Sequence, residues 1–200
     1  MSAGGAVGAG GAVGAGGAVG AGGFAALGET EVYRGSLIAV ARGRFSAPDG
    51  TVFEREVVHH PGAVVVVPLV DHSTALLVRQ YRAAIGAELL ELPAGKRDVA
   101  GEPTEVTAER ELVEEVGRRP GNLELLGRFY NSPGFCDEHT WLYLATDLVE
   151  VGDDRQGLEE EAMTLQEVRL ADVADLVAAG ELVDGKSIVG LSLAARRVGA

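Results

Sequence analysis

The pattern of apolar and polar positions predicts a pair of strands where the charged part of the chain begins. Residues 32–44 and 51–59 both have a strand-like pattern. The turn between them reads Ser-Ala-Pro-Asp-Gly, which is rich in residues that favour tight turns. We therefore expect an antiparallel hairpin in this region.

Further apolar segments predict the strands of a larger domain. Residues 62–69 contain four consecutive valines, which is typical of a buried strand. Shorter strand-like segments follow at residues 75–81, 88–92, 123–130, 140–146 and 163–170. Together these segments supply enough strands for the central sheet of one domain.

The helix predicted over residues 103–116 carries an unusual set of charges. Glu111, Glu114 and Glu115 are spaced i, i+3 and i+4, so they project from one face of the helix. Three carboxylates in the C-terminal half of a helix repel one another and oppose the helix dipole. Such residues usually form a solvated acidic face, but clustered carboxylates also suit Mg²⁺ or Mn²⁺.

Two more helices are expected near the C-terminus. Residues 171–179 have a helical pattern that ends at Gly180, and Ser187 is placed to cap a last helix running through Arg197. The order of strands, a central helix, more strands and closing helices implies an α/β/α sandwich with a mixed sheet.

The N-terminal segment has a different composition from the rest of the chain. Residues 3–20 are three copies of Ala-Gly-Gly-Ala-Val-Gly, and no charged residue occurs before Glu29. Such a segment has too little side chain to offset its ordering entropy, and no strand precedes it, as a phosphate-binding loop requires. We expect a disordered tail over 1–28, a β-hairpin region over 29–60 and one domain over 61–200.

Composition limits the compartment and the partners of the chain. The only cysteine is Cys136, which excludes an internal disulfide and suits a reducing compartment such as the cytoplasm. A net charge of −13 argues against a nucleic-acid partner, and an anionic substrate would need local positive charge. No apolar run is long enough to span a membrane.

A glycine-rich loop leads into the acidic helix, and the combined stretch resembles a known motif. The residues concerned are, in order, Gly95, Glu102, Arg110, Glu111, Leu112, Glu114, Glu115 and Gly117. They resemble the Nudix box, G-x5-E-x7-R-E-U-x-E-E-x-G-U, in which U is a bulky apolar residue. Six residues instead of five separate Gly95 from Glu102, and Arg118 stands where an apolar residue is usual. Neither departure changes the helix register. A P-loop does not fit, since Arg97 follows Lys96 where Ser or Thr is required.

The resemblance implies a metal site formed by the helix of the box and the residue that precedes it. Glu111, Glu115 and the backbone carbonyl of Ala94 would hold two or three Mg²⁺ ions, with Mn²⁺ as a possible substitute. Glu114 would be a further ligand, a supporting residue or a catalytic group. These ions would neutralise phosphate charge and lower the pKa of an attacking water.

Four residues of the box are expected to have structural roles. Arg110 would pair with Glu102 and so hold the loop against the helix. Gly95 and Gly117 would allow the loop and the helix end that the motif requires.

Three further segments resemble ADP-ribose pyrophosphatases, particularly the actinobacterial type. They are Arg79-Gln80-Tyr81-Arg82, Glu91-Leu92-Pro93-Ala94-Gly95, and Ser132-Pro133-Gly134-Phe135 followed by Asp137-Glu138. The resemblance runs from about residue 31 to the C-terminus and leaves out the tail. It implies a Mg²⁺-dependent enzyme that cleaves ADP-ribose to AMP and ribose 5-phosphate. It also implies a homodimer in which N-terminal strands are exchanged.

The same resemblance implies the residues that contact substrate, and each has an ordinary structural alternative. The candidates are Arg55 and Glu56 for the nucleoside end, Arg79 and Arg82 for phosphate or ribose, and Gly134, Phe135 and Glu138 for the terminal ribose. The alternatives are an exposed strand pair, salt bridges to local carboxylates and a tight hairpin turn, respectively.

A general base is expected from the polar loop over residues 153–161. The related enzymes take a catalytic glutamate from this loop, three residues before the apolar residue that opens the next strand. That position is Glu160, with Glu159 and Glu161 as alternatives. A carboxylate on this loop could close over substrate and orient the attacking water.

Two other functions remain open at this stage. One is hydrolysis of oxidised guanine nucleotides, and the other is binding of ADP-ribose without cleavage. Binding proteins of the second kind typically have a degraded box, whereas every acidic position is present here. The preferred nucleoside diphosphate sugar is left open by the sequence.

Overall fold

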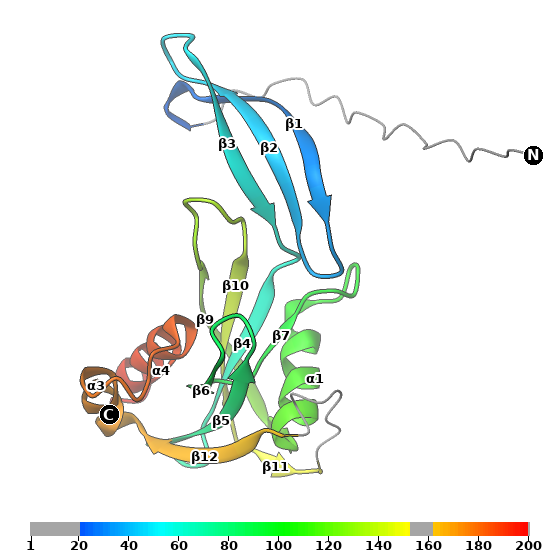
Figure 1. Ribbon diagram of the computed structural model, residues 1–200. Coiled ribbons are helices and arrows are strands. Elements are labelled where there is room, and N and C mark those ends of the chain that lie inside the picture. Colours follow the sequence, from blue (N-terminus) through cyan, green and yellow to red (C-terminus); the bar gives the residue numbers. More distant parts are fainter. Residues whose placement is uncertain (1–20, 153–161, 200) are drawn as a thin grey trace, which may run out of the picture. The chain divides into compact units, whose positions relative to one another are not determined.

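The computed structural model in Figure 1 describes residues 21–152 and 162–199. The chain forms two compact units, Met1–His59 and His60–Ala200. The division between them falls one residue before the boundary expected from the sequence.

The first unit is a three-stranded antiparallel sheet in the order β1-β2-β3. Its elements are a short 3-10 helix η1 (Ala21–Gly23), then β1 (Ala25–Arg34), β2 (Ala39–Ser46) and β3 (Val52–His59). The predicted hairpin is confirmed in β2 and β3, which pair from Ala39 with His59 to Ser46 with Val52. Its turn is closed by a hydrogen bond from the Ala47 N–H to the Thr51 carbonyl at 2.8 Å.

Two sequence predictions about this unit are wrong. The strand expected over 32–44 is interrupted, because the chain turns at Gly35, whose N–H bonds to a carbonyl three residues on. The tail expected to run to Gly28 ends earlier, because β1 begins at Ala25 and is paired to β2 from its first residue. Pairing with a neighbouring strand determines this segment more than its own weak pattern does. Residues 1–20 lie outside the described residues.

This correction predicts different results for two N-terminal truncations. A chain that begins at Ala21 keeps every described strand pair and should unfold at the parental temperature. A chain that begins at Glu29 loses residues 25–28 of β1 and about two backbone hydrogen bonds. At about 1 kcal/mol each, their loss should lower the unfolding temperature by about 4–8 °C. Differential scanning calorimetry measures both, and equal temperatures would contradict the assigned start of β1.

The described part of the second unit contains three sheets and the α-helices. The larger sheet has the order β7-β4-β10-β9, with β4 and β10 parallel and the other pairs antiparallel. Its strands are β4 (Ala63–Pro68), β7 (Ala94–Lys96), β9 (Asn122–Tyr130) and β10 (His139–Thr146). The smaller sheet is antiparallel, with β5 (Thr74–Arg82) between β6 (Ala87–Glu91) and β12 (Thr164–Arg169). Two short strands, β8 (Arg118–Arg119) and β11 (Val149–Glu150), also pair. The expected mixed sheet is therefore present, with an antiparallel sheet beside it.

The four valines of β4 show how the helices are placed. Val64 and Val66 belong to a core cluster with α1 (Thr104–Val116), whereas Val65 and Val67 belong to a cluster with α4 (Gly185–Val198). All four valines have no exposed surface. Because successive side chains of a strand point to opposite faces, α1 and α4 must cover opposite faces of this sheet. Figure 1 shows them on opposite sides of β4, as expected for an α/β/α sandwich.

The helix ends confirm most of the sequence signals. α1 follows Pro103 and ends at Gly117, whose φ of 63° lies in the left-handed region. The segment expected to be helical over 171–179 forms a 3-10 turn η2 (Leu170–Asp172) and a short α3 (Val173–Ala178). None of the described helices is long and apolar enough to cross a bilayer.

The expected cap of the last helix is wrong by three residues. α4 is capped by Asp184, whose carboxylate accepts the Ser187 N–H at 2.9 Å. Ser187 has no exposed surface and lies inside the first turn. It therefore serves another purpose, because its hydroxyl accepts the Leu92 N–H at 2.7 Å.

Candidate active site

The face of α1 that carries Glu111, Glu114 and Glu115 is not solvated throughout. Glu111 and Glu115 are only 9% and 5% exposed, although the helix places them on one face with Glu114, as predicted. Carboxylates at this depth require counter-charges or hydrogen bonds, because burial disfavours the ionised form. A solvated acidic face is therefore excluded for Glu111 and Glu115, two of the three residues.

Arg110 supplies the counter-charge from the same helix. Its Nη1 lies 2.8 Å from Glu111 Oε1 and 3.0 Å from Glu114 Oε2. Burial disfavours its charged form, but these carboxylates outweigh that effect and raise the pKa of Arg110. The expected pair with Glu102 exists at 3.5 Å, yet Glu102 accepts a shorter hydrogen bond from the Thr107 hydroxyl at 2.7 Å. Arg110 is thus mainly a partner of the helix carboxylates.

Strand β7 brings backbone groups of the loop to this acidic face. The Ala94 N–H donates to Glu115 Oε2 at 3.1 Å. Ala94 lies opposite Val65, and the Val66 N–H bonds to the Pro93 carbonyl, so Ala94 occupies a non-hydrogen-bonded position of the antiparallel pair. Both of its backbone groups therefore point away from β4, and its carbonyl lies on the side where its N–H meets Glu115.

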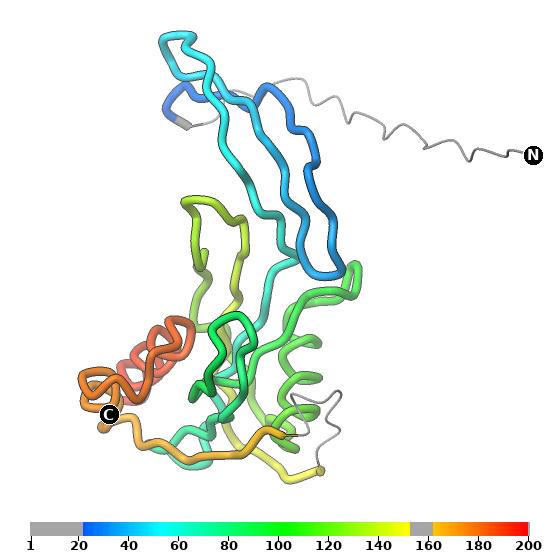
Figure 2. Tube along the Cα trace, in the orientation of Figure 1, coloured from blue at the N-terminus to red at the C-terminus, as the bar shows by residue number. Residues whose placement is uncertain are grey.

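Gly95 is required by direct contact with the helix. A Cβ at this position would lie 1.8 Å from the carboxyl carbon of Glu111 and 2.0 Å from its Oε1. No side chain larger than hydrogen fits without displacing that carboxylate or the strand. The structural role expected for Gly95 therefore has a specific reason: the backbone of β7 packs directly on Glu111. The continuous path from β6 through β7 to α1 can be followed in Figure 2.

The oxygen atoms at this position are of the kinds that bind a divalent cation. Carboxylates and a backbone carbonyl are the oxygen ligands that Mg²⁺ and Mn²⁺ bind. Within residues 21–152 and 162–199, no three acidic, histidine or cysteine side chains converge as a preformed metal cluster. Arg110 contacts oxygens of Glu111 and Glu114 that an ion would use.

The two arginines expected to meet phosphate both have protein partners. Arg82 forms a bidentate pair with Glu91, with 2.7 Å from Nε to Oε1 and 2.7 Å from Nη2 to Oε2. The hydrogen bond to Glu91 raises the pKa of Arg82. Arg79 donates from Nη2 to Gln166 Oε1 at 2.9 Å. The salt-bridge alternative is therefore present at Arg82, although more than a third of its side chain remains exposed.

The turn between β9 and β10 contains the residues expected near the terminal ribose. The Phe135 N–H bonds to the Ser132 carbonyl at 3.1 Å, and the Phe135 side chain is exposed. A Cβ at Gly134 would meet nothing within 4 Å, so this glycine is not required for packing. Glu138 lies 4.0 Å from His60.

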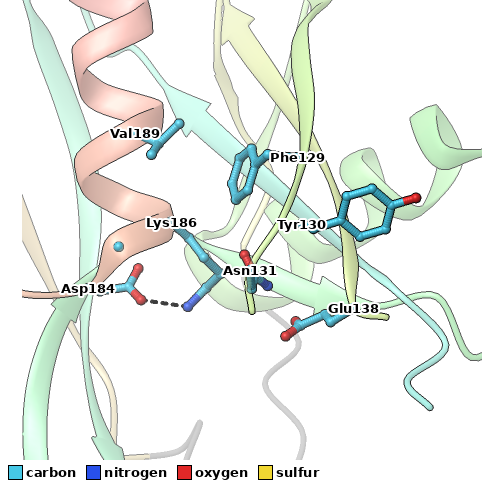
Figure 3. Close-up of a pocket in the computed structure, with 8 residues that line it drawn as sticks. Phe129, Tyr130, Asn131, Glu138, Asp184, Lys186 and Val189 are labelled. Carbon is cyan, nitrogen blue, oxygen red and sulfur yellow. Dashed lines mark hydrogen bonds and ion pairs between the residues drawn. The ribbon is translucent and has the colours of Figure 1, made fainter. Parts of the chain in front are cut away.

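Glu138 lines a pocket of about 390 Å³ in the second unit, shown in Figure 3. Polar groups enter it from the turn end of the β9–β10 hairpin and from the start of α4, and an apolar wall completes it. The residues drawn include Phe129, Asn131, Glu138, Asp184, Lys186 and Val189. Gly134 and Phe135 do not line it. Of the three residues expected at the ribose, the structure thus brings only Glu138 to this pocket.

Arg55 and Glu56 lie in the first unit, on β3. Both are exposed, and Glu56 is opposite Arg42 across the β2–β3 pair. The Arg55 guanidinium lies 4.8 Å from the centre of the Phe53 ring, as in a cation–π contact. Arg42, Glu54, Arg55 and Glu56 line a shallow pocket of about 440 Å³. Glu160 lies outside the described residues.

Sequence reasoning missed the polar cluster that includes the partner of Arg82. Its members are Glu91, Asp184, Lys186 and Ser187. A signal was available, because Glu91 is a charged residue at the end of an apolar strand, where burial demands a partner. The identity of that partner depends on how the sheets and helices pack.

The fold and the stretch from Gly95 to Gly117 define a class of protein. Residues 58–188 match the NUDIX domain family, so the chain belongs to this family. It is 40% identical to the ADP-ribose pyrophosphatase of Mycobacterium tuberculosis over 168 residues, which cover 84% of this chain and 81% of that protein. It is 35% identical to the ADP-ribose pyrophosphatase of Bacillus subtilis over 161 residues, covering 80% and 86%. A crystal structure of an ADP compounds hydrolase matches with a TM-score of 0.75 and 24% identity, over 87% of this chain and 93% of that one, which confirms the fold.

Proposed function

We propose that this chain hydrolyses the diphosphate of ADP-ribose to AMP and ribose 5-phosphate. The observation that carries the proposal is the contact of β7 with α1, where Gly95 packs on Glu111 and Ala94 donates to Glu115. This contact gathers buried carboxylates and a backbone carbonyl at one edge of the sheet. The two relatives described above carry the activity in their names, which favours ADP-ribose over oxidised guanine nucleotides.

The chain's own residues have distinct parts in this reaction. Glu111, Glu115 and the Ala94 carbonyl would hold Mg²⁺, or Mn²⁺ in its place. The ion, when bound, supplies charge neutralisation at the diphosphate and makes a water easier to ionise. Arg82 and Arg79 bind phosphate or ribose oxygens through N–H groups that their protein partners leave free. Glu114 supports the face through Arg110.

We place the terminal ribose beside Glu138. The pocket there offers the Glu138 carboxylate, the Asn131 amide and the Lys186 ammonium group, which can bond to sugar hydroxyls. Gly134 and Phe135 belong to the turn above this pocket and would contribute backbone groups. Arg55 and Glu56 would hold the nucleoside end of the substrate from a second copy of the chain.

The first unit supports a homodimer with exchanged N-terminal strands. β1 is a ten-residue edge strand that is largely exposed, and its Val32 and Tyr33 are 64% and 57% exposed. A long exposed edge strand with apolar side chains is a pairing surface for another chain. Light scattering should give twice the 20.7 kDa mass of one chain, and a monomer mass would contradict the exchange.

The general base is assigned to Glu160, on the resemblance alone. Glu160→Gln should reduce turnover by about 10²–10⁴-fold with little change in KM, because a base acts on the chemical step. Glu159→Gln and Glu161→Gln should remain within a few-fold of the parent. Steady-state hydrolysis of ADP-ribose compares the three. A collapse at a neighbour, with Glu160→Gln unaffected, would move the assignment by one residue.

A substrate panel with product chromatography tests the proposed function. ADP-ribose, other nucleoside diphosphate sugars and an oxidised guanine nucleotide are incubated with Mg²⁺. ADP-ribose should give AMP and ribose 5-phosphate in equal amounts. Activity should vanish with excess chelator and return with Mg²⁺ or Mn²⁺. Tight binding of ADP-ribose without products would instead identify a sensor, and activity in excess chelator would exclude the metal site. The reaction is expected in a reducing compartment, the cytoplasm.

A further inference from the structure

Glu91 is a buried charge that the reaction outlined above does not use. Its side chain is 1% exposed, yet it ends strand β6 within three residues of Ala94. Both of its oxygens bond to Arg82 at 2.7 Å, and Oε2 also lies 3.6 Å from Lys186 Nζ. A buried carboxylate is stable only when its partners and geometry are good. Two cations and a bidentate contact meet that condition here.

The bidentate contact fixes the direction of the Arg82 guanidinium. A guanidinium has five N–H groups in one plane, and Glu91 engages one on Nε and one on Nη2. Three N–H groups remain, including both on Nη1, at the edge of the plane away from Glu91. The Arg82 side chain is 38% exposed, whereas Glu91 is almost completely covered. A bound anion would therefore meet the edge that Glu91 does not engage.

The first turn of α4 holds Glu91 and the next residue in place. The Ser187 hydroxyl accepts the Leu92 N–H at 2.7 Å and donates to Asp184 at 2.6 Å. Lys186 bridges Asp184, at 2.6 Å, to Glu91. Burial opposes ionisation of Asp184, but Lys186 and the Ser187 hydrogen bonds outweigh it and lower its pKa.

Helix α4 and the segment from Glu91 to Ala94 approach each other closely at this point. A Cβ at Gly190 of α4 would lie 2.5 Å from Leu92 Cδ1, so no larger residue fits between them. On the other side, the Ala94 N–H is held by Glu115 of α1. The segment from Glu91 to Ala94 is therefore fixed by both helices, and three extended residues span at most about 11 Å.

We propose that Glu91 is a positioning residue for the hydrolysis, which aims Arg82 at the substrate diphosphate while α4 sets its position. This inference rests on the proposed function, in which Arg82 contacts the substrate. The salt bridge at Arg82 and the phosphate contact are then compatible, because they use different edges of one guanidinium. Glu91, which pairs with Arg82, is also followed within three residues by the Ala94–Gly95 backbone. The short segment from Glu91 to Gly95 therefore fixes the position of Arg82 relative to the acidic face of α1.

Glu91→Asp is the variant that separates position from charge. It keeps the buried negative charge but withdraws the carboxylate by about 1.5 Å, the length of one C–C bond. A misplacement of about 1 Å in a positioning group can reduce the rate about 100-fold. We expect kcat/KM for ADP-ribose to fall about 10- to 100-fold, mainly through KM. The unfolding temperature should also fall, because the buried ion pair is loosened, and circular dichroism shows whether the variant is folded at the assay temperature. The matched control is Glu124→Gln, which breaks the exposed bridge to Arg197 and should leave kcat/KM unchanged.

A double-mutant cycle with Arg82→Ala gives the decisive comparison. If Glu91 acts through Arg82, then Glu91→Asp should have no further effect once Arg82 is absent. If the double variant loses kcat/KM by the product of the two single losses, the two residues act independently and the positioning role is overturned. The role is also overturned if Glu91→Asp keeps the parental kcat/KM while Arg82→Ala is impaired. If Arg82→Ala keeps the parental activity, Arg82 does not contribute a substrate contact, and the proposal that Glu91 positions it for the reaction is overturned. Should Glu91→Asp not fold, Arg82→Lys keeps the charge without a bidentate fork, and parental activity there would overturn the proposal.

Discussion

Gly95→Ala should abolish detectable hydrolysis of ADP-ribose, a loss of at least about 100-fold in kcat. The added Cβ would lie 1.8 Å from the carboxyl carbon of Glu111, far closer than any two such atoms approach. The strand cannot retreat easily, because Gly95 is paired with Val64 and the preceding Ala94 is hydrogen-bonded to Glu115. Glu111 must therefore move, and a displacement of about 1 Å at a catalytic group is enough for a loss of this size.

The control for this variant is a glycine that tolerates a methyl group. Gly127 lies in β9, and a Cβ there would meet only Leu193 Cδ1, at 4.0 Å, which is an ordinary contact. Gly127→Ala should retain parental kcat. Steady-state rates at saturating Mg²⁺, with circular dichroism to show that both variants fold, make the comparison. Near-parental turnover in folded Gly95→Ala would mean that Glu111 is not needed where the structure places it.

Local patterns in the sequence were sufficient where one segment determines its own structure. The consecutive valines of β4 predicted a buried strand, and they fill both faces of the sheet as such a strand requires. Gly117 predicted the end of α1, and it adopts the left-handed conformation that such an end favours. The spacing of Glu111 and Glu115 placed them on one face. In each case the information lies within a few neighbouring residues.

The failures occur where a distant segment decides the outcome. The start of β1 looked like part of the Gly/Ala tail, since only its pairing with β2 makes residues 25–28 a strand. Serine and aspartate both commonly cap helices, so the sequence alone does not distinguish Ser187 from Asp184. The contact that gives Ser187 another role, from the Leu92 N–H to its hydroxyl, joins segments far apart in the chain. For Arg82 the sequence indicates either a phosphate or ribose contact or a salt bridge to a local carboxylate. Its partner Glu91 lies nine residues away, on a neighbouring strand of the smaller sheet.

The burial of the acidic face could not be read from spacing either. The i, i+3, i+4 pattern is equally compatible with a solvated face. The difference between a solvated and a buried acidic face is made by the approach of β7. This strand packs Gly95 on Glu111 and gives Glu115 a backbone hydrogen-bond donor. Arg110 then balances the charge from within the helix. An acidic face that the fold buries beside the Ala94–Gly95 backbone has oxygen ligands of the kind a cation binds, and its residues can be tested one at a time.

Glu115→Gln should lower turnover by at least about 100-fold while leaving the fold intact without metal. The amide has the size of the carboxylate, and its oxygen can still accept the Ala94 N–H that Glu115 accepts at 3.1 Å. The substitution also removes one of the three like charges that share one face of α1, so the free energy of unfolding in chelator should be unchanged or slightly higher. The loss of activity would then come from weaker binding of the divalent ion.

Two measurements on this variant separate the metal site from a structural role. Thermal unfolding with increasing Mg²⁺ reports ion binding without catalysis, because an ion that binds only the native state raises its stability. The parent should show a clear increase, and Glu115→Gln a smaller one that needs more Mg²⁺. Glu109→Gln is the matched control on the same helix, since Glu109 is half exposed and lies 3.7 Å from Arg119. It should match the parent in both assays. If Glu115→Gln responds to Mg²⁺ as the parent does yet loses activity, Glu115 acts on substrate rather than metal, and the ligand set must be revised.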